Sequence, residues 1–287
     1  MRKPSIPKRP SELALFVLAR LVVAGAAALI LVPLAFMLSA SFMPASDIVS
    51  IPYRWIPDGL RWKNYLQALA GNDGSWLYAR NVLNSLVVAG AVAATTVAIS
   101  ASVGYGFAKF RFRGRNLAFM AVMATMMIPF ETVMVPLYLV VVRLGFQDSY
   151  LGLILPFMAS AFGVFLMRQY LLGFPDDIVD AARIDGCSEW RIFRSVVLPS
   201  IGPASATLAV LAFRQQWDNL LWPLLVVQRE EMKTIPAYIV KFAAEKSADE
   251  GAMMAVAVIA SLPVFILFIT LSKYFLGGSA VFAAGKE

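Results

Sequence analysis

The sequence lacks histidine, contains a single cysteine, Cys187, and carries charge on only 15% of its 287 residues. Without histidine there is no imidazole acid or base, and one cysteine allows neither an internal disulfide nor a cysteine-rich metal site. A phosphate-binding G-x-x-x-x-G-K-[ST] loop is also missing, since the one Gly-Lys pair is Gly285-Lys286. These absences exclude most familiar active sites and predict that the chain is not an enzyme and hydrolyses no nucleotide by itself.

Apolar residues dominate instead and make up 60% of the sequence. A soluble domain usually has about a quarter of its residues charged, which this chain does not approach. A transmembrane helix needs about 20 mainly apolar residues. Scanning at that length predicts an all-α membrane protein with one domain over residues 1–287. Its six expected spans are 21–42, 83–108, 117–142, 150–167, 196–227 and 252–275.

Prolines predict that two of these spans are not straight. The third span contains Pro129 and Pro136, and the fifth contains Pro199, Pro203 and Pro223. Because proline removes a backbone donor and clashes with the preceding turn, it kinks or ends a helix. We therefore expect breaks in both spans.

The charged residues predict the orientation of the chain. The first span follows a basic start and exceeds the apolar core of a signal peptide, about 7 to 15 residues, so a retained anchor is expected rather than a cleaved leader. With the amino terminus inside, 15 of the 25 basic residues fall in inside segments, nine in outside segments and one, Arg214, within a span. Because cytoplasmic loops are enriched in Lys and Arg, both chain ends are expected in the cytoplasm. The basic balance thus follows topology and does not indicate nucleic acid.

Residues 173–195, between the fourth and fifth spans, have the pattern helix, turn, helix. Pro175 is suited to a helix start, Gly186 to a left-handed helix end and Ser188 to the start of the next helix. A loop resting on the bilayer surface would show the same periodicity, so this pattern alone does not assign a role. The apolar side of the second helix is expected to consist of Trp190, Phe193 and Val197.

The spacing of this segment resembles a known signature. Asp180-Ala181-Ala182, three further residues, Gly186, nine further residues and Val196-Val197-Leu198-Pro199 are similar to the E-A-A…G…I-x-L-P signature of binding-protein-dependent importer permeases. Asp180 stands where the family usually has Glu, and Val196 where it usually has Ile. The resemblance implies the type I fold of ATP-binding-cassette (ABC) importer permeases, with this segment as a coupling helix on the ATPase subunit. The ATPase-coupling residues would be Asp180, Ala181, Ala182, Gly186, Leu198 and Pro199.

Other stretches resemble the carbohydrate branch of that family, which includes the maltose-type second permease and the glycerol-3-phosphate-type permeases. They are Asn84-Ser85-Leu86, Leu153-Ile154-Leu155-Pro156 and the run Trp217-Asp218-Asn219-Leu220-Leu221-Trp222-Pro223, which is similar to a W-N-x-x-x-W/F-P motif. The resemblance implies an inner-membrane subunit that imports a sugar or polyol with a second permease, two ATP-binding subunits and an extracytoplasmic solute-binding protein. It implies no cofactor on this chain, with ATP and Mg on the partner ATPase.

Charged residues inside the spans are candidates for the solute pathway. Arg214 and Asp218 are four residues apart, so they share a helical face and can neutralise each other. Glu131 is either a second partner for Arg214 or a pathway group of its own. Stacking rings and an amide are suited to sugar rings and hydroxyls, and the fifth span offers Trp217, Asn219 and Trp222.

Three interpretations remain open at this point. A neutralised Arg214 fits a sugar, whereas an isolated cation would favour an anionic phosphorylated polyol such as glycerol 3-phosphate. An ion-driven secondary transporter would use Glu131, Arg214 and Asp218 as a relay. The sequence does not decide which solute is carried or which side chains touch it.

Overall fold

The computed structural model describes residues 10–244 and 249–283, and every regular element in these two stretches is a helix. This confirms the all-α prediction for the described chain. Its contacts form two compact units, Met1–Trp76 with Lys241–Leu262, and Leu77–Val240 with Pro263–Glu287. The chain ends expected in the cytoplasm, residues 1–9 and 284–287, lie outside the described residues.

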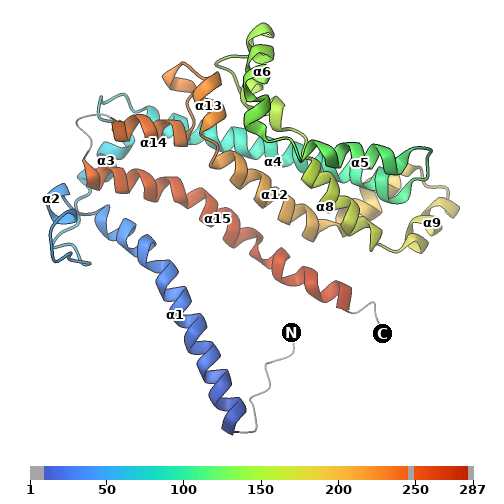
Figure 1. The fold of residues 1–287 in the computed structure, drawn as a ribbon, viewed down its shortest axis with the longest axis horizontal. Helices are drawn as coiled ribbons and strands as arrows, with labels where there is room; N and C mark the ends of the chain where they lie inside the picture. Colours follow the sequence, from blue (N-terminus) through green and yellow to red (C-terminus); the bar gives the residue numbers. More distant parts are fainter. Residues whose placement is uncertain (1–9, 245–248, 284–287) are drawn as a thin grey trace. The chain divides into compact units, whose positions relative to one another are not determined.

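The longest helix of the first unit is α1 (Pro10–Ala40), drawn in blue in Figure 1. Most of its aliphatic side chains from Leu13 to Leu38 are exposed. A helix that is apolar all round is suited to lipid. It begins at Pro10 rather than at residue 21, because Glu12 and Arg20 lower the hydropathy without opposing helix formation. Two short helices of the same unit follow, α2 (Ala45–Ile48) and α3 (Lys63–Ala70).

Asn64 on α3 ties the first unit together. Its side-chain Nδ2 donates to the carbonyl oxygens of Ser41 at 3.0 Å and Met43 at 2.8 Å. Gly251 packs directly against this asparagine and against the Met43 carbonyl, so a Cβ at position 251 has no room. The start of α15 (Glu250–Ala283) is thereby fixed against the segment that follows α1.

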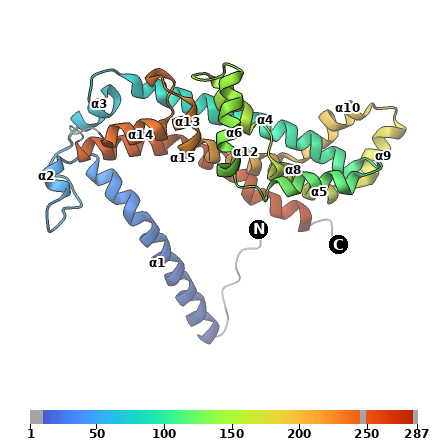
Figure 2. The same cartoon turned by 45° about the horizontal axis from the view of Figure 1, so that its top comes forward.

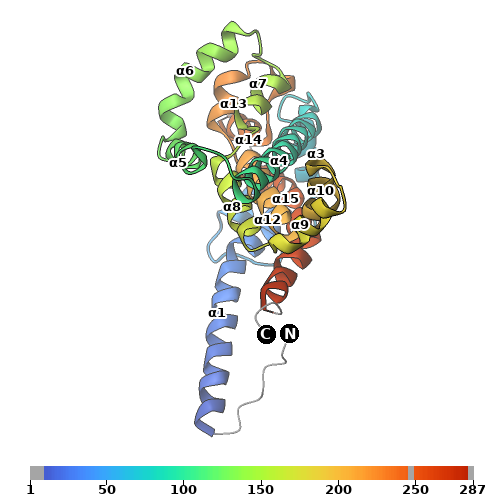
Figure 3. The ribbon, with the colours of Figure 1, turned by 90° about the vertical axis from the view of Figure 1, so that its right-hand side faces the viewer.

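The second unit is built on α4 (Leu77–Lys109), an unbroken 33-residue helix. It packs against α8 (Ala161–Leu172) and α12 (Gly202–Trp217), which lie beside it in Figure 3. Gly104 makes a close approach possible, since a Cβ there would lie 2.7 Å from the Met167 Cβ on α8. Small residues at such crossings allow membrane helices to pack backbone to backbone.

Three helix pairs of this unit are sharply bent. α5 (Arg115–Thr125) and α6 (Phe130–Arg143) meet at 91°, which Figure 1 shows as α6 turned away from α5. The break falls just before Pro129 as expected, whereas Pro136 is accommodated inside α6. The other two pairs bend by 45° and 77°. Their elements are α7 (Tyr150–Ile154) and η1 (Leu155–Phe157) with α8, and α10 (Glu189–Ile192), η2 (Phe193–Val197) and α11 (Leu198–Ser200) with α12.

The bends decide how the expected spans are counted. In the described residues, three helices are long and apolar enough to cross a membrane, and counting each bent pair as one span brings the number to six. The expected fifth span ends its main helix at Trp217 instead of running straight to residue 227, in agreement with its prolines. The remaining helices are α9 (Asp176–Ile184), α13 (Leu221–Val226), η3 (Glu230–Met232) and α14 (Ile235–Ala244).

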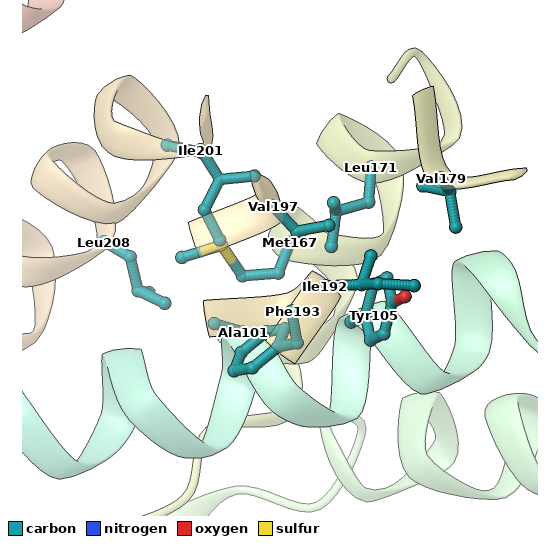
Figure 4. Packing of buried hydrophobic residues seen from close by; sticks show 11 residues of the cluster. Ala101, Tyr105, Met167, Leu171, Val179, Ile192, Phe193, Val197, Ile201 and Leu208 are labelled. Carbon is teal, nitrogen blue, oxygen red and sulfur yellow. The ribbon is translucent and has the colours of Figure 1, made fainter. Parts of the chain in front are cut away.

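A hydrophobic cluster joins three parts of the second unit. Tyr105 from α4, Met167 from α8 and Leu208 from α12 meet in it (Figure 4). The segment 173–195 adds Val179, Ile192 and Phe193 to the same cluster. This packing holds the segment against the carboxyl-terminal end of α4, where Figure 2 shows α9 and α10 together.

Candidate functional site: a coupling segment and a pocket in the helical unit

The helix α9 in the segment 173–195 ends through its backbone. Gly186 has a φ of +78°, so it occupies the left-handed region as the sequence predicts. The Gly186 N–H donates to the Arg183 carbonyl at 3.0 Å, and the Cys187 N–H donates to the Ala182 carbonyl at 3.0 Å. This pair of bonds is a Schellman motif, which satisfies carbonyls that the helix end would leave open. Ser188 then caps α10, because its Oγ accepts from the Arg191 N–H at 3.4 Å.

The two helices of the segment bury fewer apolar residues than expected. Val179 and Ile192 are fully buried, but Trp190 is 67% exposed and Ile184 is 87% exposed. Trp190 contacts Phe193 as expected for the apolar side of the second helix, with ring centroids 5.7 Å apart, but unlike Phe193 and Val197 it is not buried. Ile184 and Trp190 are thus apolar side chains that the described residues leave exposed.

Arg183 links the two helices of the segment. Its Nη1 pairs with Asp180 Oδ1 at 2.8 Å and its Nε with Glu189 Oε1 at 2.7 Å. The bond from Glu189 is the main reason that the pKa of Arg183 is raised above its ordinary value. The second oxygen of Glu189 accepts a hydrogen bond from the Tyr105 hydroxyl of α4 at 3.0 Å. The predicted coupling residue Asp180 is therefore the first member of a network that reaches α4.

Lys109, the last residue of α4, holds the beginning of α9. Its Nζ donates to the Phe174 carbonyl at 2.6 Å and to Asp176 Oδ1 at 2.5 Å. The Lys109 side chain is only 5% exposed, whereas that of Asp176 is 74% exposed. The hydrogen bond and charge of Lys109 lower the pKa of Asp176. Both ends of α9 are thus connected, directly or through Arg183, to α4.

The other predicted coupling residues have different surroundings. Ala181 is exposed and Ala182 is partly buried against the hydrophobic cluster. Leu198 and Pro199 are exposed in the short helix α11, directly after the π turn. Pro199 has no N–H for the Ser195 carbonyl four residues earlier, which is consistent with a helix that is distorted just before it and bent just after it.

A pocket of about 550 Å³ opens within the second unit. Of the six candidate pathway residues, Glu131, Asp218 and Asn219 line it. Two glutamines that the sequence analysis did not single out, Gln215 and Gln216, line it as well. The pocket therefore lies where α6 begins and where α12 ends.

Arg214 is paired as expected. Its Nε lies 3.3 Å from Asp218 Oδ2, and the two side chains are 69% and 57% exposed. Asp218, rather than Glu131, is thus the partner of Arg214. Asn219 is also held in place, because its Nδ2 donates to Gln216 Oε1 at 3.2 Å and its Oδ1 accepts from the Trp222 N–H at 3.4 Å.

The two candidate tryptophans do not face the pocket. Trp217 is buried and stacks on Phe213 with ring centroids 5.5 Å apart. Trp222 is fully buried, and its indole Nε1 donates to the Gly152 carbonyl at 2.9 Å. Rings enclosed in this way cannot stack on a solute in this conformation. The expectation of two stacking surfaces is corrected accordingly, and Trp222 supports the pocket wall through contacts with Phe130 and Phe157.

The sequence pattern did not identify Tyr105, Lys109 and Glu189 as parts of the site. Tyr105 and Glu189 are 84 positions apart, so no local spacing predicts their hydrogen bond. The one available signal for Lys109 is a cation at the end of a long apolar helix, which is ordinary for a membrane protein. Arg183 was visible as a charge on α9, but its bond to Glu189 depends on the turn at Gly186.

Comparison with known proteins gives a consistent result. Residues 94–278 match the family described as "Binding-protein-dependent transport system inner membrane component". The arabinooligosaccharides transport system permease protein AraQ of Bacillus subtilis (strain 168) is 36% identical over 255 residues, which are 88% of this chain and 90% of the relative. The sn-glycerol-3-phosphate transport system permease protein UgpE of Brucella abortus (strain 2308) is 34% identical over 251 residues, with coverages of 86% and 89%. The lactose transport system permease protein LacG of Rhizobium radiobacter is 34% identical over 195 residues, with coverages of 68% and 71%.

A solved structure has a similar fold. It is the crystal structure of a bacterial ABC transporter involved in the import of the acidic polysaccharide alginate, with a TM-score of 0.80 and 24% sequence identity. The match covers 94% of this chain and 99% of that chain. It shows the fold expected from the E-A-A…G…I-x-L-P resemblance.

Proposed function

Because the chain belongs to the family of inner membrane components of binding-protein-dependent transport systems, we propose that it forms half of the pathway by which an ATP-driven importer admits a sugar or related polyol. A second permease would form the other half, two ATP-binding subunits would drive transport, and an extracytoplasmic solute-binding protein would deliver the solute. In this proposal, the three long helices and three bent pairs are six spans with both chain ends in the cytoplasm.

The polarity of the pocket carries the proposal for the solute. Its polar lining includes the carboxylates Glu131 and Asp218 and the amides of Gln215, Gln216 and Asn219, and no Lys or Arg occurs among its described lining residues. Carboxylates and amides bind hydroxyl groups, whereas they repel or only weakly attract an anion. The relatives named for arabinooligosaccharides and lactose agree with a neutral, hydroxyl-rich solute.

The segment 173–195 supplies the proposed connection to the ATPase. Its exposed Ile184 and Trp190 offer an apolar surface, and Asp180 offers a partly paired carboxylate beside it. Exposed apolar patches with a polar rim are typical of protein interfaces. ATP and Mg would bind to the partner ATPase, and this chain would contribute the contact surface.

A phosphorylated polyol is the second candidate, supported by the relative named for sn-glycerol 3-phosphate. The phosphate of such a solute would need a cation in the pathway. Arg214 is next to the pocket residue Asp218 but is paired with it. The Asp218 charge offsets that of Arg214 and weakens its attraction for an anion, which makes the neutral solute the simpler assignment.

Uptake by cells in which this chain is deleted and then restored tests the proposal. The solutes are radiolabelled arabinooligosaccharide, lactose and glycerol 3-phosphate. We expect uptake of at least one sugar to depend on the chain, and expect Asp218→Asn to lower it about threefold to tenfold, the size of one ordinary hydrogen bond. Dependence of glycerol 3-phosphate uptake alone would overturn the sugar assignment in favour of the anionic solute.

The secondary-transporter interpretation has its own test. Proteoliposomes are prepared with the complete assembly and with this chain alone, and an ion gradient or ATP is supplied. We expect uptake only with the assembly and ATP. Gradient-driven uptake by the chain alone would overturn the importer proposal.

A further inference from the structure

Two side chains on one face of α4, near its carboxyl-terminal end, form hydrogen bonds to the segment 173–195. Tyr105 and Lys109 are four residues apart on this helix, so their side chains lie one above the other. Tyr105 donates to Glu189 at the start of α10, and Lys109 binds Phe174 and Asp176 at the start of α9. One helical turn of α4 therefore holds the segment 173–195 at two separate points.

Packing in the hydrophobic cluster holds the ring of Tyr105 in place. Its ring lies in the hydrophobic cluster beside Phe193, with the two ring centroids 5.4 Å apart (Figure 4). Its hydroxyl reaches the carboxylate of Glu189. An aromatic side chain has few rotamers, so displacement of Glu189 is resisted by the whole ring. This contact is stiffer than one made by a long flexible side chain.

The segment itself is braced so that it moves as one piece. Arg183 bonds to Asp180 on its own helix and to Glu189 on the next. The backbone of Gly186 and Cys187 closes the end of α9 between these two contacts. A force on α9 is thus passed to Glu189, and from there to Tyr105.

The same α4 helix reaches the pocket. Val92 and Thr96 line the pocket, and the Thr96 hydroxyl donates to the Phe157 carbonyl at 3.2 Å. Nine residues separate Thr96 from Tyr105, about 13 Å along an α-helix. Because α4 is continuous from Leu77 to Lys109, displacement of one end is carried to the pocket without a hinge.

We propose that Tyr105 and Lys109 are positioning residues that transmit movement of the segment 173–195 to α4, and through α4 to the pocket wall at Val92 and Thr96. This inference rests on the proposed function, because it concerns how ATPase closure changes the solute pathway. It assigns a transmission role to two residues that touch neither solute nor ATPase in the proposal.

The test uses the full importer in proteoliposomes, with its second permease, ATPase subunits and binding protein. The variants are Tyr105→Phe and Lys109→Met, and the measured quantity is solute imported per ATP hydrolysed. We expect this ratio to fall about threefold to tenfold for Tyr105→Phe, the size of one ordinary hydrogen bond, and at least as much for Lys109→Met, which loses two hydrogen bonds. ATP hydrolysis stimulated by the binding protein should continue in both.

Tyr150→Phe is the matched control. The Tyr150 hydroxyl donates to Asn84 Oδ1 at 2.7 Å near the other end of α4, so this variant also loses one tyrosine hydrogen bond to α4. Its ratio of solute to ATP should be unchanged. A thermal unfolding scan of all three variants separates loss of folding from loss of transmission.

Unchanged solute per ATP in both Tyr105→Phe and Lys109→Met would overturn the transmission role. An equal fall in Tyr150→Phe would also overturn it, because the effect would then follow from any lost bond to α4. Failure of the wild-type assembly to import any sugar with ATP is a separate result, which contradicts the proposed function itself.

Discussion

The two ends of α4 are held by different chemistry. Near its amino-terminal end, Asn84 donates to the carbonyls of Glu231 at 2.8 Å and Lys233 at 3.0 Å, and the Ser85 hydroxyl accepts from the Ile235 N–H at 2.8 Å. Asn84 and Ser85 are buried, and their partners there are mainly backbone groups. At the carboxyl-terminal end the partners are one backbone carbonyl, that of Phe174, and the carboxylates of Asp176 and Glu189, whose side chains are 74% and 41% exposed.

The two ends of α4 therefore differ in how much their bonds contribute to stability. A buried amide bonded to backbone carbonyls leaves unpaired polar groups if it moves, and each costs about 1–3 kcal/mol. A pair whose carboxylate is partly exposed contributes only about 0–1 kcal/mol to stability, so its loss affects folding little. The amino-terminal end therefore contributes more to fold stability, whereas the contacts at the carboxyl-terminal end position the segment 173–195.

Asn84→Ala tests the contribution of the amino-terminal end of α4 to stability and should have the largest effect. It removes the donor to two buried carbonyls and the acceptor of Tyr150, so we expect a loss of about 2–4 kcal/mol in the free energy of unfolding. Thermal or chemical unfolding of the detergent-purified chain measures it. Asn116→Ala, at an exposed asparagine of α5, is the matched control and should change stability little. Equal effects of the two variants would remove the basis for the comparison.

Gly186→Val is expected to have the second-largest effect on stability. The left-handed φ of +78° disfavours a β-branched residue by about 1–2 kcal/mol, although no atom crowds the position. We expect reduced stability and ATP-driven uptake. Gly186→Asn should be milder, because asparagine tolerates this conformation. Gly202→Ala, at a glycine without positive φ or close neighbours, is the control. Similar losses for Val and Asn would contradict a backbone cause.

Arg183→Lys should separate stability from coupling. Lysine keeps the charge but cannot bond to Asp180 and Glu189 with the planar fork of arginine. We expect less than about 1 kcal/mol change in unfolding, because both pairs are partly exposed, together with lower solute uptake per ATP. A large stability loss would show that this end is as fixed as the other.

The smallest effect is expected for Asp176→Asn. Because the folded pKa of Asp176 is lowered from 3.8, the stabilisation from its Lys109 pair is fully present above the unfolded value and is lost as the pH falls through the folded value. The unfolding temperatures of the two proteins should therefore differ slightly at neutral pH and converge below pH 3.8. A difference that persists in acid would indicate packing rather than charge.

Local features of the segment were predictable from the sequence. The left-handed Gly186 and the cap at Ser188 depend on neighbouring residues alone, and the Arg214–Asp218 pair follows from a spacing of four. The burial of Trp222 could not be predicted, because it depends on Phe130 and Phe157 from other elements. The exposure of Trp190 could not be predicted either, because helical spacing places it beside Phe193 without showing what else covers it.

The breaks in the spans and the lining of the pocket were also only partly predictable from the sequence. Hydropathy located the three long apolar helices α1, α4 and α15, and prolines located the breaks near Pro129 and Pro199. Neither hydropathy nor proline positions showed that the stretch from Tyr150 to Leu172 bends by 45°, since Pro156 lies in a short 3-10 turn there. Which polar groups then face the pocket depends on these angles, so Gln215 and Gln216 emerged from the structure alone.

The helix breaks place beginnings and ends of helices around the pocket. Glu131 lies in the first turn of α6, Ser160 caps the start of α8, and Asp218 follows the last residue of α12, and all three line the pocket. Helix beginnings carry partial positive charge and helix ends partial negative charge. A hydroxyl, which both donates and accepts, is matched to two such poles of opposite sign. In the proposed importer, part of the selectivity for a hydroxyl-rich solute would then reside in the main-chain dipoles, which no single side-chain substitution removes.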